Sequence, residues 1–122
     1  MGDALLEAVG LSNEQLEGLY SCALALLFPS LEEGFGWPIL EAQACGCPVV
    51  TTDRAPMNDV AGGAAILIDP TQPAAAGMIA EGLRDTTRLR SDGLRNAASY
   101  TAERMFEQCE ALYRKTASAA RT

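Results

Sequence analysis

The sequence contains no histidine, only four cysteines, and few basic residues for its size. Nine Lys and Arg stand against sixteen Asp and Glu, which gives a net charge of −7 at pH 7. Binding to nucleic acid depends on clusters of cationic side chains that neutralise phosphates, so this charge balance argues against it. Only one residue lies between Cys45 and Cys47, whereas about two to four residues usually lie between paired zinc ligands, and the sequence has no histidine to complete a site. We therefore expect no bound metal, no cofactor and small, buried, reduced thiols in a cytoplasmic protein.

Long apolar segments are also absent from the sequence. No stretch approaches the ~20 apolar residues that span a bilayer. Residues 1–9 lack the basic start and the long apolar run of a signal peptide. With 122 residues, of which 48% are hydrophobic, the chain amounts to one folded domain at most.

What is present is an alternation of apolar segments with helical patterns. Ser12 and Gln15 have the spacing of a capping box, which predicts the start of a helix. Residues 23–28 are apolar throughout, which is typical of a strand buried on both faces of a parallel sheet. Further strands are expected at 48–52 and 64–68, and further helices at 38–46, 56–60, 73–84, 88–98 and 101–115. This alternation predicts an α/β fold with a parallel, Rossmann-like sheet and flanking helices, in which ligands bind beyond the carboxyl ends of the strands.

The turn at residues 33–36 lies where such a ligand would bind. It follows a strand and leads into the N-terminus of a helix, where free N–H groups and the helix dipole favour an anion. Gly34 and Gly36 allow a ligand to approach the backbone closely. Two carboxylates, Glu33 in the loop and Glu41 in the helix, suit the hydroxyl groups of a sugar on either side of that anion. This arrangement describes a nucleotide-sugar, although the loop alone is equally compatible with a structural turn.

The full pattern is more specific than the loop. Glu33 and Glu41 are separated by seven residues. The surrounding residues are Pro29-Ser30, Glu33-Gly34-Phe35-Gly36, Pro38, Glu41-Ala42, Gly46 and Pro48-Val49, followed by Val60, Ala64 and Asp69-Pro70. In these features residues 5–115 resemble the family 4 retaining glycosyltransferases, which have the GT-B fold. The resemblance implies that residues 1–122 are part of the C-terminal nucleotide-sugar-binding domain, without the N-terminal acceptor domain and the first half of this domain.

The resemblance also implies roles for individual residues. Glu33 would be the catalytic residue and would contact the donor sugar near the reacting carbon. Glu41 would accept hydrogen bonds from the ribose hydroxyls of the nucleotide. The backbone N–H groups that would bind the sugar hydroxyls and the diphosphate are those of Gly34, Phe35, Gly36 and Trp37. The implied partners are a UDP-, GDP- or ADP-sugar donor and an unidentified acceptor, with the full-length enzyme at the inner face of the membrane.

The sequence departs from the family in its cations. The Arg and Lys that neutralise the diphosphate in the family lie earlier in the domain, and Arg54 and Arg84 do not match them, so we expect both to be surface residues. Stabilisation of the leaving group is usually the largest electrostatic contribution to such chemistry, so this chain should bind the donor weakly and transfer nothing measurable. A sheet without its first strands would leave residues 5–9 without neighbours and 23–28 with an apolar edge. We therefore expect a homodimer through that edge or a swapped assembly.

Two other classes of protein were weighed against this interpretation. A dehydrogenase would need a Gly-x-Gly-x-x-Gly segment after its first strand, and the sequence has none. A stand-alone nucleotide-sugar-binding or assembly module would keep the motif without doing chemistry, and the missing cations favour it for this chain as it stands.

Overall fold

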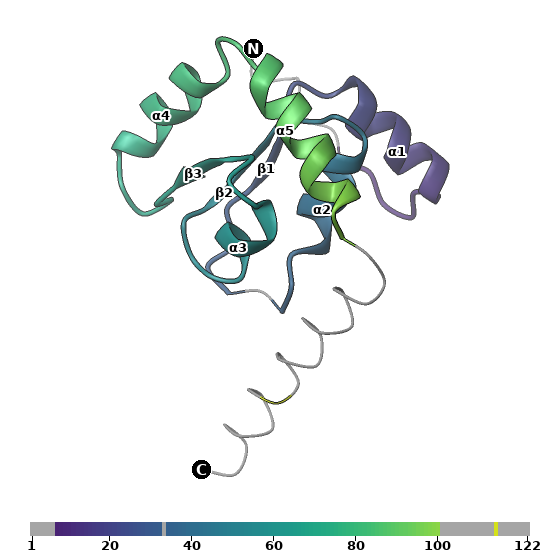
Figure 1. Cartoon of the computed structure of the whole chain (residues 1–122), viewed down its shortest axis with the longest axis horizontal. Helices are drawn as coiled ribbons and strands as arrows, with labels where there is room; N and C mark the ends of the chain where they lie inside the picture. Colours follow the sequence, from purple (N-terminus) through teal and green to yellow (C-terminus); the bar gives the residue numbers. More distant parts are fainter. Residues whose placement is uncertain (1–6, 33, 101–113, 115–122) are drawn as a thin grey trace.

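A computed structural model of the chain describes residues 7–32, 34–100 and 114 (Figure 1). Its elements are α1 (Asn13–Cys22), β1 (Leu26–Phe28), α2 (Trp37–Ala44), β2 (Val49–Thr52), α3 (Met57–Ala61), β3 (Ile66–Ile68), α4 (Ala74–Gly82) and α5 (Thr87–Ala98). The three strands form a parallel sheet in the order β1-β2-β3. The predicted α/β, Rossmann-like fold is therefore confirmed.

The ends of the helices follow from short-range signals in the sequence. The Ser12 hydroxyl accepts a hydrogen bond from the Gln15 N–H at 3.1 Å, and the Gln15 side chain accepts one from the Ser12 N–H at 2.9 Å. These two bonds are the predicted capping box, and they satisfy N–H groups that the first turn of α1 leaves free. Gly46 and Gly62, with φ of 74° and 62°, follow α2 and α3 in the left-handed conformation that glycine adopts without strain.

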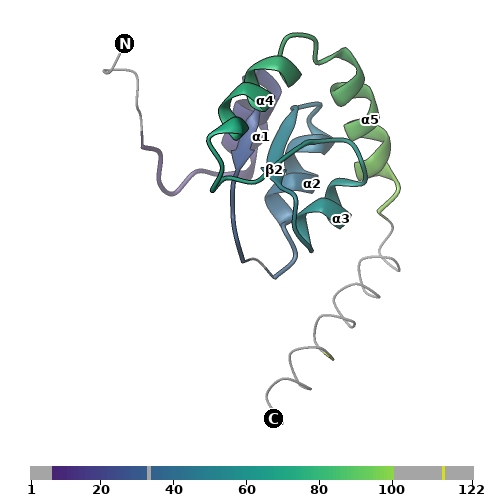
Figure 2. The ribbon, with the colours of Figure 1, turned by 90° about the vertical axis from the view of Figure 1, so that its left-hand side faces the viewer.

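Helices cover both faces of the sheet (Figures 1 and 2). Consecutive side chains of a strand point to opposite faces, so Val49 and Val50 enter different parts of the core. Val49 packs with Ile39 of α2 and Val60 of α3, whereas Val50 packs with Ala75 of α4. The sheet is thus sandwiched between α2 and α3 on one face and α4 on the other.

A buried polar network fixes α5 against α2 and α3. The Asn96 amide donates to the Gln43 side-chain oxygen at 2.7 Å and to the Val60 carbonyl at 2.8 Å. The Gln43 amide in turn donates to the carbonyls of Ala61 at 3.1 Å and Ala64 at 3.3 Å. Gln43 is only 1% exposed, so its polar atoms depend on these partners rather than on water.

The first strand differs from the prediction. Only Leu26–Phe28 is extended, and this strand is an edge of the sheet. Leu26 and Phe28 pack on the core beneath α2, so Leu27 points to the opposite face, where it is 58% exposed. The expectation of burial on both faces is wrong, because α4 packs over β3 and leaves this face of β1 uncovered.

The expected elements at the two ends of the chain are only partly described. Residues 7–9 have no regular secondary structure, so the apolar run at 5–9 does not continue as a strand there. The helix expected at 101–115 lies outside the described residues, apart from residue 114. Among the helices of the described ranges, none has the length and apolar character needed to cross a membrane.

Candidate functional site

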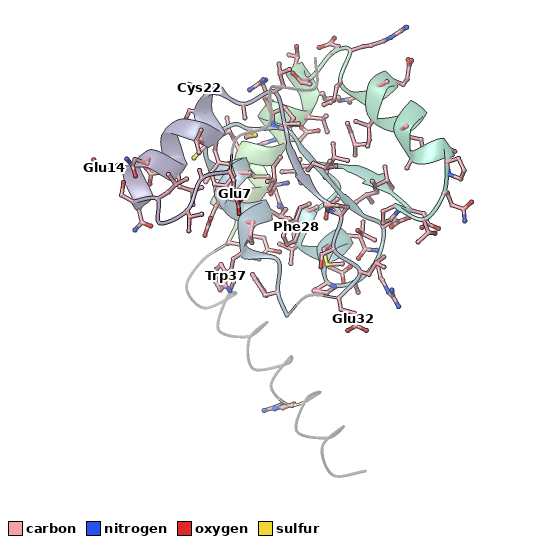
Figure 3. The ribbon with its side chains drawn as sticks, turned by 180° about the vertical axis from the view of Figure 1, so that it is seen from behind. Glu7, Glu14, Cys22, Phe28, Glu32 and Trp37 are labelled. Atoms are coloured by element: carbon pink, nitrogen blue, oxygen red, sulfur yellow. The ribbon has the colours of Figure 1, made fainter. Side chains whose placement is uncertain are left out.

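The loop after β1 leaves the carboxyl end of the sheet and leads into α2, as the sequence predicted. The Thr51 hydroxyl donates to the Phe28 carbonyl at 2.8 Å and joins the end of β1 to β2. Within the loop, the Ser30 hydroxyl donates to the Glu32 carbonyl at 2.8 Å. Figure 3 shows Glu32 and Trp37 at the same end of the molecule, on either side of this loop. Glu33, the expected catalytic residue, lies outside the described residues, so its position stays a prediction.

Gly36 makes the turn into α2. Its φ of 90° is in the left-handed region, and a Cβ at this position would lie 3.3 Å from the Ile39 Cδ1 atom. The Ile39 N–H donates to the Gly36 carbonyl at 3.0 Å and closes the first turn. The helix begins at Trp37, one residue earlier than predicted, so Pro38 is its second residue and not its first. Proline is accepted there because the first turn of a helix has no intrahelical use for its N–H group.

The backbone around Gly36 offers hydrogen-bond donors. In the part of the chain that the structure describes, no group accepts a hydrogen bond from the N–H of Gly34, Phe35, Gly36 or Trp37. The Phe35 side chain is 7% exposed and packs in the core, with its ring centroid 4.6 Å from that of Trp37. Trp37 itself is 41% exposed. The Phe35 ring therefore anchors the turn, while the N–H groups on both sides of it can serve a ligand.

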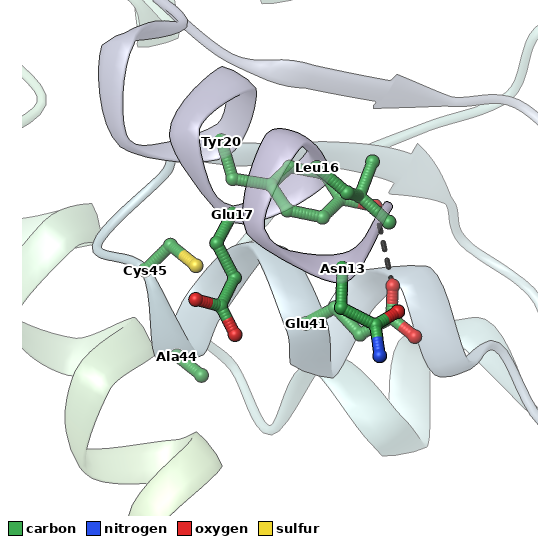
Figure 4. A pocket seen from close by; sticks show the side chains of 7 residues that line it. All are labelled: Asn13, Leu16, Glu17, Tyr20, Glu41, Ala44 and Cys45. Carbon is green, nitrogen blue, oxygen red and sulfur yellow. Dashed lines mark hydrogen bonds between the residues drawn. The ribbon is translucent and has the colours of Figure 1, made fainter. Parts of the chain in front are cut away.

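Glu41 lies on the exposed side of α2, beside a cavity of about 340 Å³ between α1 and α2 (Figure 4). The residues that line the cavity are Asn13, Leu16, Glu17, Tyr20, Glu41, Ala44 and Cys45. The Tyr20 hydroxyl donates to the Glu41 Oε2 atom, 3.5 Å away. A carboxylate on the wall of an open cavity can accept further hydrogen bonds from a ligand.

The surroundings of Tyr20 keep its hydroxyl protonated. Burial raises the pKa of Tyr20, and the neighbouring Glu41 carboxylate raises it further, both by its charge and by accepting the hydrogen bond. Smaller contributions in the same direction come from Cys47 and Cys45. At neutral pH, Tyr20 is therefore a hydrogen-bond donor to Glu41.

Comparison with known proteins identifies the family. The family model described as Glycosyl transferases group 1 matches residues 3–85. The chain belongs to this family. No solved structure was found to match it.

Three curated relatives of this group 1 glycosyltransferase chain are much longer than it is. MMP alpha-(1->4)-mannosyltransferase of Mycolicibacterium hassiacum is 31% identical over 123 aligned positions, which cover 94% of this chain and 30% of that protein. O-antigen chain mannosyltransferase B of Escherichia coli is 45% identical over 58 residues, 48% of this chain and 15% of the relative. D-inositol 3-phosphate glycosyltransferase of Paenarthrobacter aurescens is 35% identical over 88 residues, 70% of this chain and 22% of the relative. The chain thus spans less than a third of the length of these curated relatives.

The cations and thiols of the group 1 glycosyltransferase chain lie largely as expected. Arg54 and Arg84 are exposed, and Arg84 pairs with a glutamate of α4 at 3.6 Å. Cys47 is buried and unpaired, and burial raises the pKa of its thiol. Cys22 is exposed, which corrects the expectation that the thiols are buried. Within residues 7–32 and 34–100, no three His, Cys, Asp or Glu side chains gather in a way that could hold a metal ion.

Sequence reasoning identified Glu41 but missed the residues opposite it. Tyr20 follows Leu16 by four residues, a spacing that indicates only a shared apolar face of a helix. Its polar hydroxyl was the available signal, because a half-buried tyrosine usually has a hydrogen-bond partner. That partner is 21 residues away in the sequence, and only the packing of α1 on α2 reveals it.

Proposed function

We propose that this chain is the donor-binding part of a retaining glycosyltransferase with the GT-B architecture. It binds a nucleotide-diphospho-sugar, and the complete enzyme transfers the glycosyl group to an acceptor. Membership of the group 1 family supports the reaction class. The observation that carries the assignment of the site is the position of Glu41, which lies beside an open cavity and in the helix that begins at Trp37, where the N–H groups of residues 34–37 have no acceptor among the described residues.

The order of groups along α2 matches the order of groups in the proposed donor. The N–H groups of Gly34, Phe35 and Gly36 would bind the sugar hydroxyls, and that of Trp37 would bind the diphosphate at the positive end of the helix. Glu41 is four residues further on, which corresponds to about 6 Å along the helix axis. A carboxylate at that place would accept hydrogen bonds from the ribose hydroxyls without facing the phosphates directly.

In the proposed reaction, the bond between the anomeric carbon and the diphosphate oxygen breaks. The acceptor hydroxyl oxygen bonds to the same face of that carbon, and its proton passes to the released nucleoside diphosphate. Glu33 would contact the donor sugar near the reacting carbon. The N–H groups at the start of α2 would stabilise the charge that develops on the leaving group.

We propose that residues 1–122 of this chain are part of the C-terminal domain of a longer enzyme. The acceptor domain, the first half of this domain and the Arg and Lys that bind the diphosphate would be supplied by the remainder of that enzyme. We accordingly propose that the isolated chain binds donor weakly and transfers nothing measurable. The full-length enzyme would work in the cytoplasm, at the inner face of the membrane.

One observation favours a second function, a non-catalytic binding or assembly module. β1 is an edge of the sheet. Leu27 in this strand is 58% exposed, and Leu24, just before the strand, is 83% exposed. Exposed apolar edges invite pairing with another chain, so we propose a homodimer through β1, and an assembly module would use the same edge. A monomer by light scattering at working concentrations would count against the homodimer.

The donor site is tested by recording amide NMR shifts of the whole chain during titration with UDP-, GDP- and ADP-hexoses. The variants are Glu41→Ala and, as a matched control, Glu81→Ala, which removes an exposed carboxylate from α4. Shifts at residues 34–41 that favour one nucleotide, disappear in Glu41→Ala and persist in Glu81→Ala are the expected result. Absence of shifts at millimolar donor would show that this chain is not a donor-binding unit. Unchanged shifts in Glu41→Ala would remove Glu41 from the site.

A further inference from the structure

We infer that Tyr20 is a positioning residue for Glu41, and that its hydroxyl orients the Glu41 carboxylate toward the ribose hydroxyls of the donor. The inference rests on the proposed function, because it concerns the same carboxylate. It adds a residue of α1 to a site that the sequence placed wholly in the loop after β1 and in α2.

The two ends of Tyr20 have different surroundings. Its ring is partly buried and packs against the core cluster that contains Phe35 and Ile39. Its hydroxyl emerges in the cavity between α1 and α2, where Figure 4 shows it directed at Glu41. A ring held by the core gives the hydroxyl a fixed place, which a flexible surface side chain could not provide.

Glu41 needs such a partner more than most surface residues do. Its side chain is exposed and has several rotatable bonds, so an unpaired carboxylate would have to be ordered when the ligand binds. Among the described residues, Tyr20 is the side chain that donates a hydrogen bond to it. Glu17 lines the same cavity and carries a like charge, so it cannot take this role.

The geometry leaves room for the ligand. Tyr20 uses one acceptor position of Oε2, and a carboxylate has about four, so the remaining positions can serve two neighbouring ribose hydroxyls. The separation of 3.5 Å is long for an O–H···O bond.

The first test measures ligand binding to the whole chain with Tyr20→Phe, which removes the hydroxyl and keeps the ring. We expect Tyr20→Phe to weaken binding of the preferred nucleoside diphosphate about threefold to tenfold, the effect of one modest hydrogen bond. Two comparisons identify the route of the effect. A 2′,3′-dideoxynucleotide should bind the variant and the unchanged chain equally, and Tyr20→Phe should add nothing to the loss caused by Glu41→Gln.

The outcomes separate this inference from the proposed function. If Glu41→Gln weakens binding and Tyr20→Phe does not, the role of Tyr20 is wrong and the donor site stands. If neither the unchanged chain nor any variant binds nucleotide, the proposed function fails for this chain and the inference fails with it. An equal loss for the dideoxynucleotide would mean that Tyr20 acts through packing, which would also overturn the inference.

A second test needs no ligand and keeps the contact itself open to refutation. The phenol of Tyr20 is titrated by NMR with a label at the tyrosine Cζ, in the unchanged chain and in Glu41→Gln. Because the carboxylate raises the pKa of Tyr20, removing its charge should lower that pKa. The other titratable groups near the phenol, Glu17, Cys45 and Cys47, are the same in both proteins. An unchanged pKa of Tyr20 would show that the hydroxyl does not lie beside Glu41.

Discussion

Replacement of Asn96 by alanine should lower the free energy of unfolding by more than the partly exposed position of Asn96 suggests. The Asn96 amide is the donor that satisfies the Gln43 side-chain oxygen, and Gln43 is 1% exposed. Water cannot easily replace this donor, so the substitution leaves a buried acceptor without a partner. It also removes the bond to the Val60 carbonyl, which keeps a longer contact of 3.4 Å with the Tyr100 hydroxyl.

The magnitude follows from these two losses. An unsatisfied buried polar group costs about 1–3 kcal/mol, and a lost hydrogen bond whose acceptor keeps another partner costs about 0.5–1.5 kcal/mol. Together they predict a decrease of about 1.5–4.5 kcal/mol in the free energy of unfolding, which is a large part of the ~5–15 kcal/mol typical of a domain. Each kcal/mol should lower Tm by about 2–8 °C for a chain in this size range.

The assay is urea unfolding followed by circular dichroism, with Ser91→Ala as the control. Ser91 lies in the same helix and is exposed, so its replacement should change the free energy of unfolding by less than about 0.5 kcal/mol. Gln43→Leu and the double variant Gln43→Leu/Asn96→Ala test the mechanism, because removing both partners of the 2.7 Å hydrogen bond should cost less than the sum of the two single changes. Similar stabilities of Asn96→Ala and Ser91→Ala would refute the reasoning, and additive losses in the double variant would refute the mechanism.

Three further predictions concern other parts of the fold. Gly36→Ala should lower the free energy of unfolding by about 1–2 kcal/mol, because φ is 90° at this position. The control Gly77→Ala lies in α4 with open space around it, so it should leave that free energy unchanged or raise it. Urea unfolding of the two variants measures both effects. The buried Cys47 thiol, whose pKa is raised, should react with a thiol reagent at pH 8 far more slowly than the exposed Cys22, and equal rates of labelling by mass spectrometry would contradict the described burial. Leu27→Lys should shift a dimer toward monomer by light scattering, and a dimer that is unaffected would exclude pairing through β1.

The sequence predicted the elements whose signals are local. The capping box at Ser12 depends on a few neighbouring residues and was found where expected. Gly46, the last residue of the helix expected at 38–46, lies just after α2 in the left-handed conformation. The parallel direction of the strands was also predicted from the sequence, because alternating strands and helices allow few other arrangements. Expectations that concerned burial were less successful. The exposure of Leu27 depends on which strand α4 covers, and no local pattern contains that information.

In the candidate site too, the sequence predicted what depends on local pattern and missed what depends on packing between helices. The sequence pattern brought Glu41 into the site through its spacing from Glu33, and the structure then placed it beside an open cavity. Tyr20 could not be found this way, because its role depends on a contact between two helices. Glu33 lies outside the described residues, so its role still rests on the pattern alone.

Neighbouring residues of α2 serve opposite purposes, which makes the proposals separable by experiment. Glu41 is on the exposed side of the helix, whereas Gln43, two residues later, is buried and bonded to α5 through Asn96. Loss of the Gln43–Asn96 contact should lower both stability and nucleotide binding, because α2 carries the proposed ligand groups. Loss of the Glu41 carboxylate should lower binding and leave the free energy of unfolding nearly unchanged, since the hydrogen bond that it accepts from Tyr20 is exposed and long. A Glu41→Gln variant as unstable as Asn96→Ala would show that Glu41 is part of the structural framework instead of the donor site.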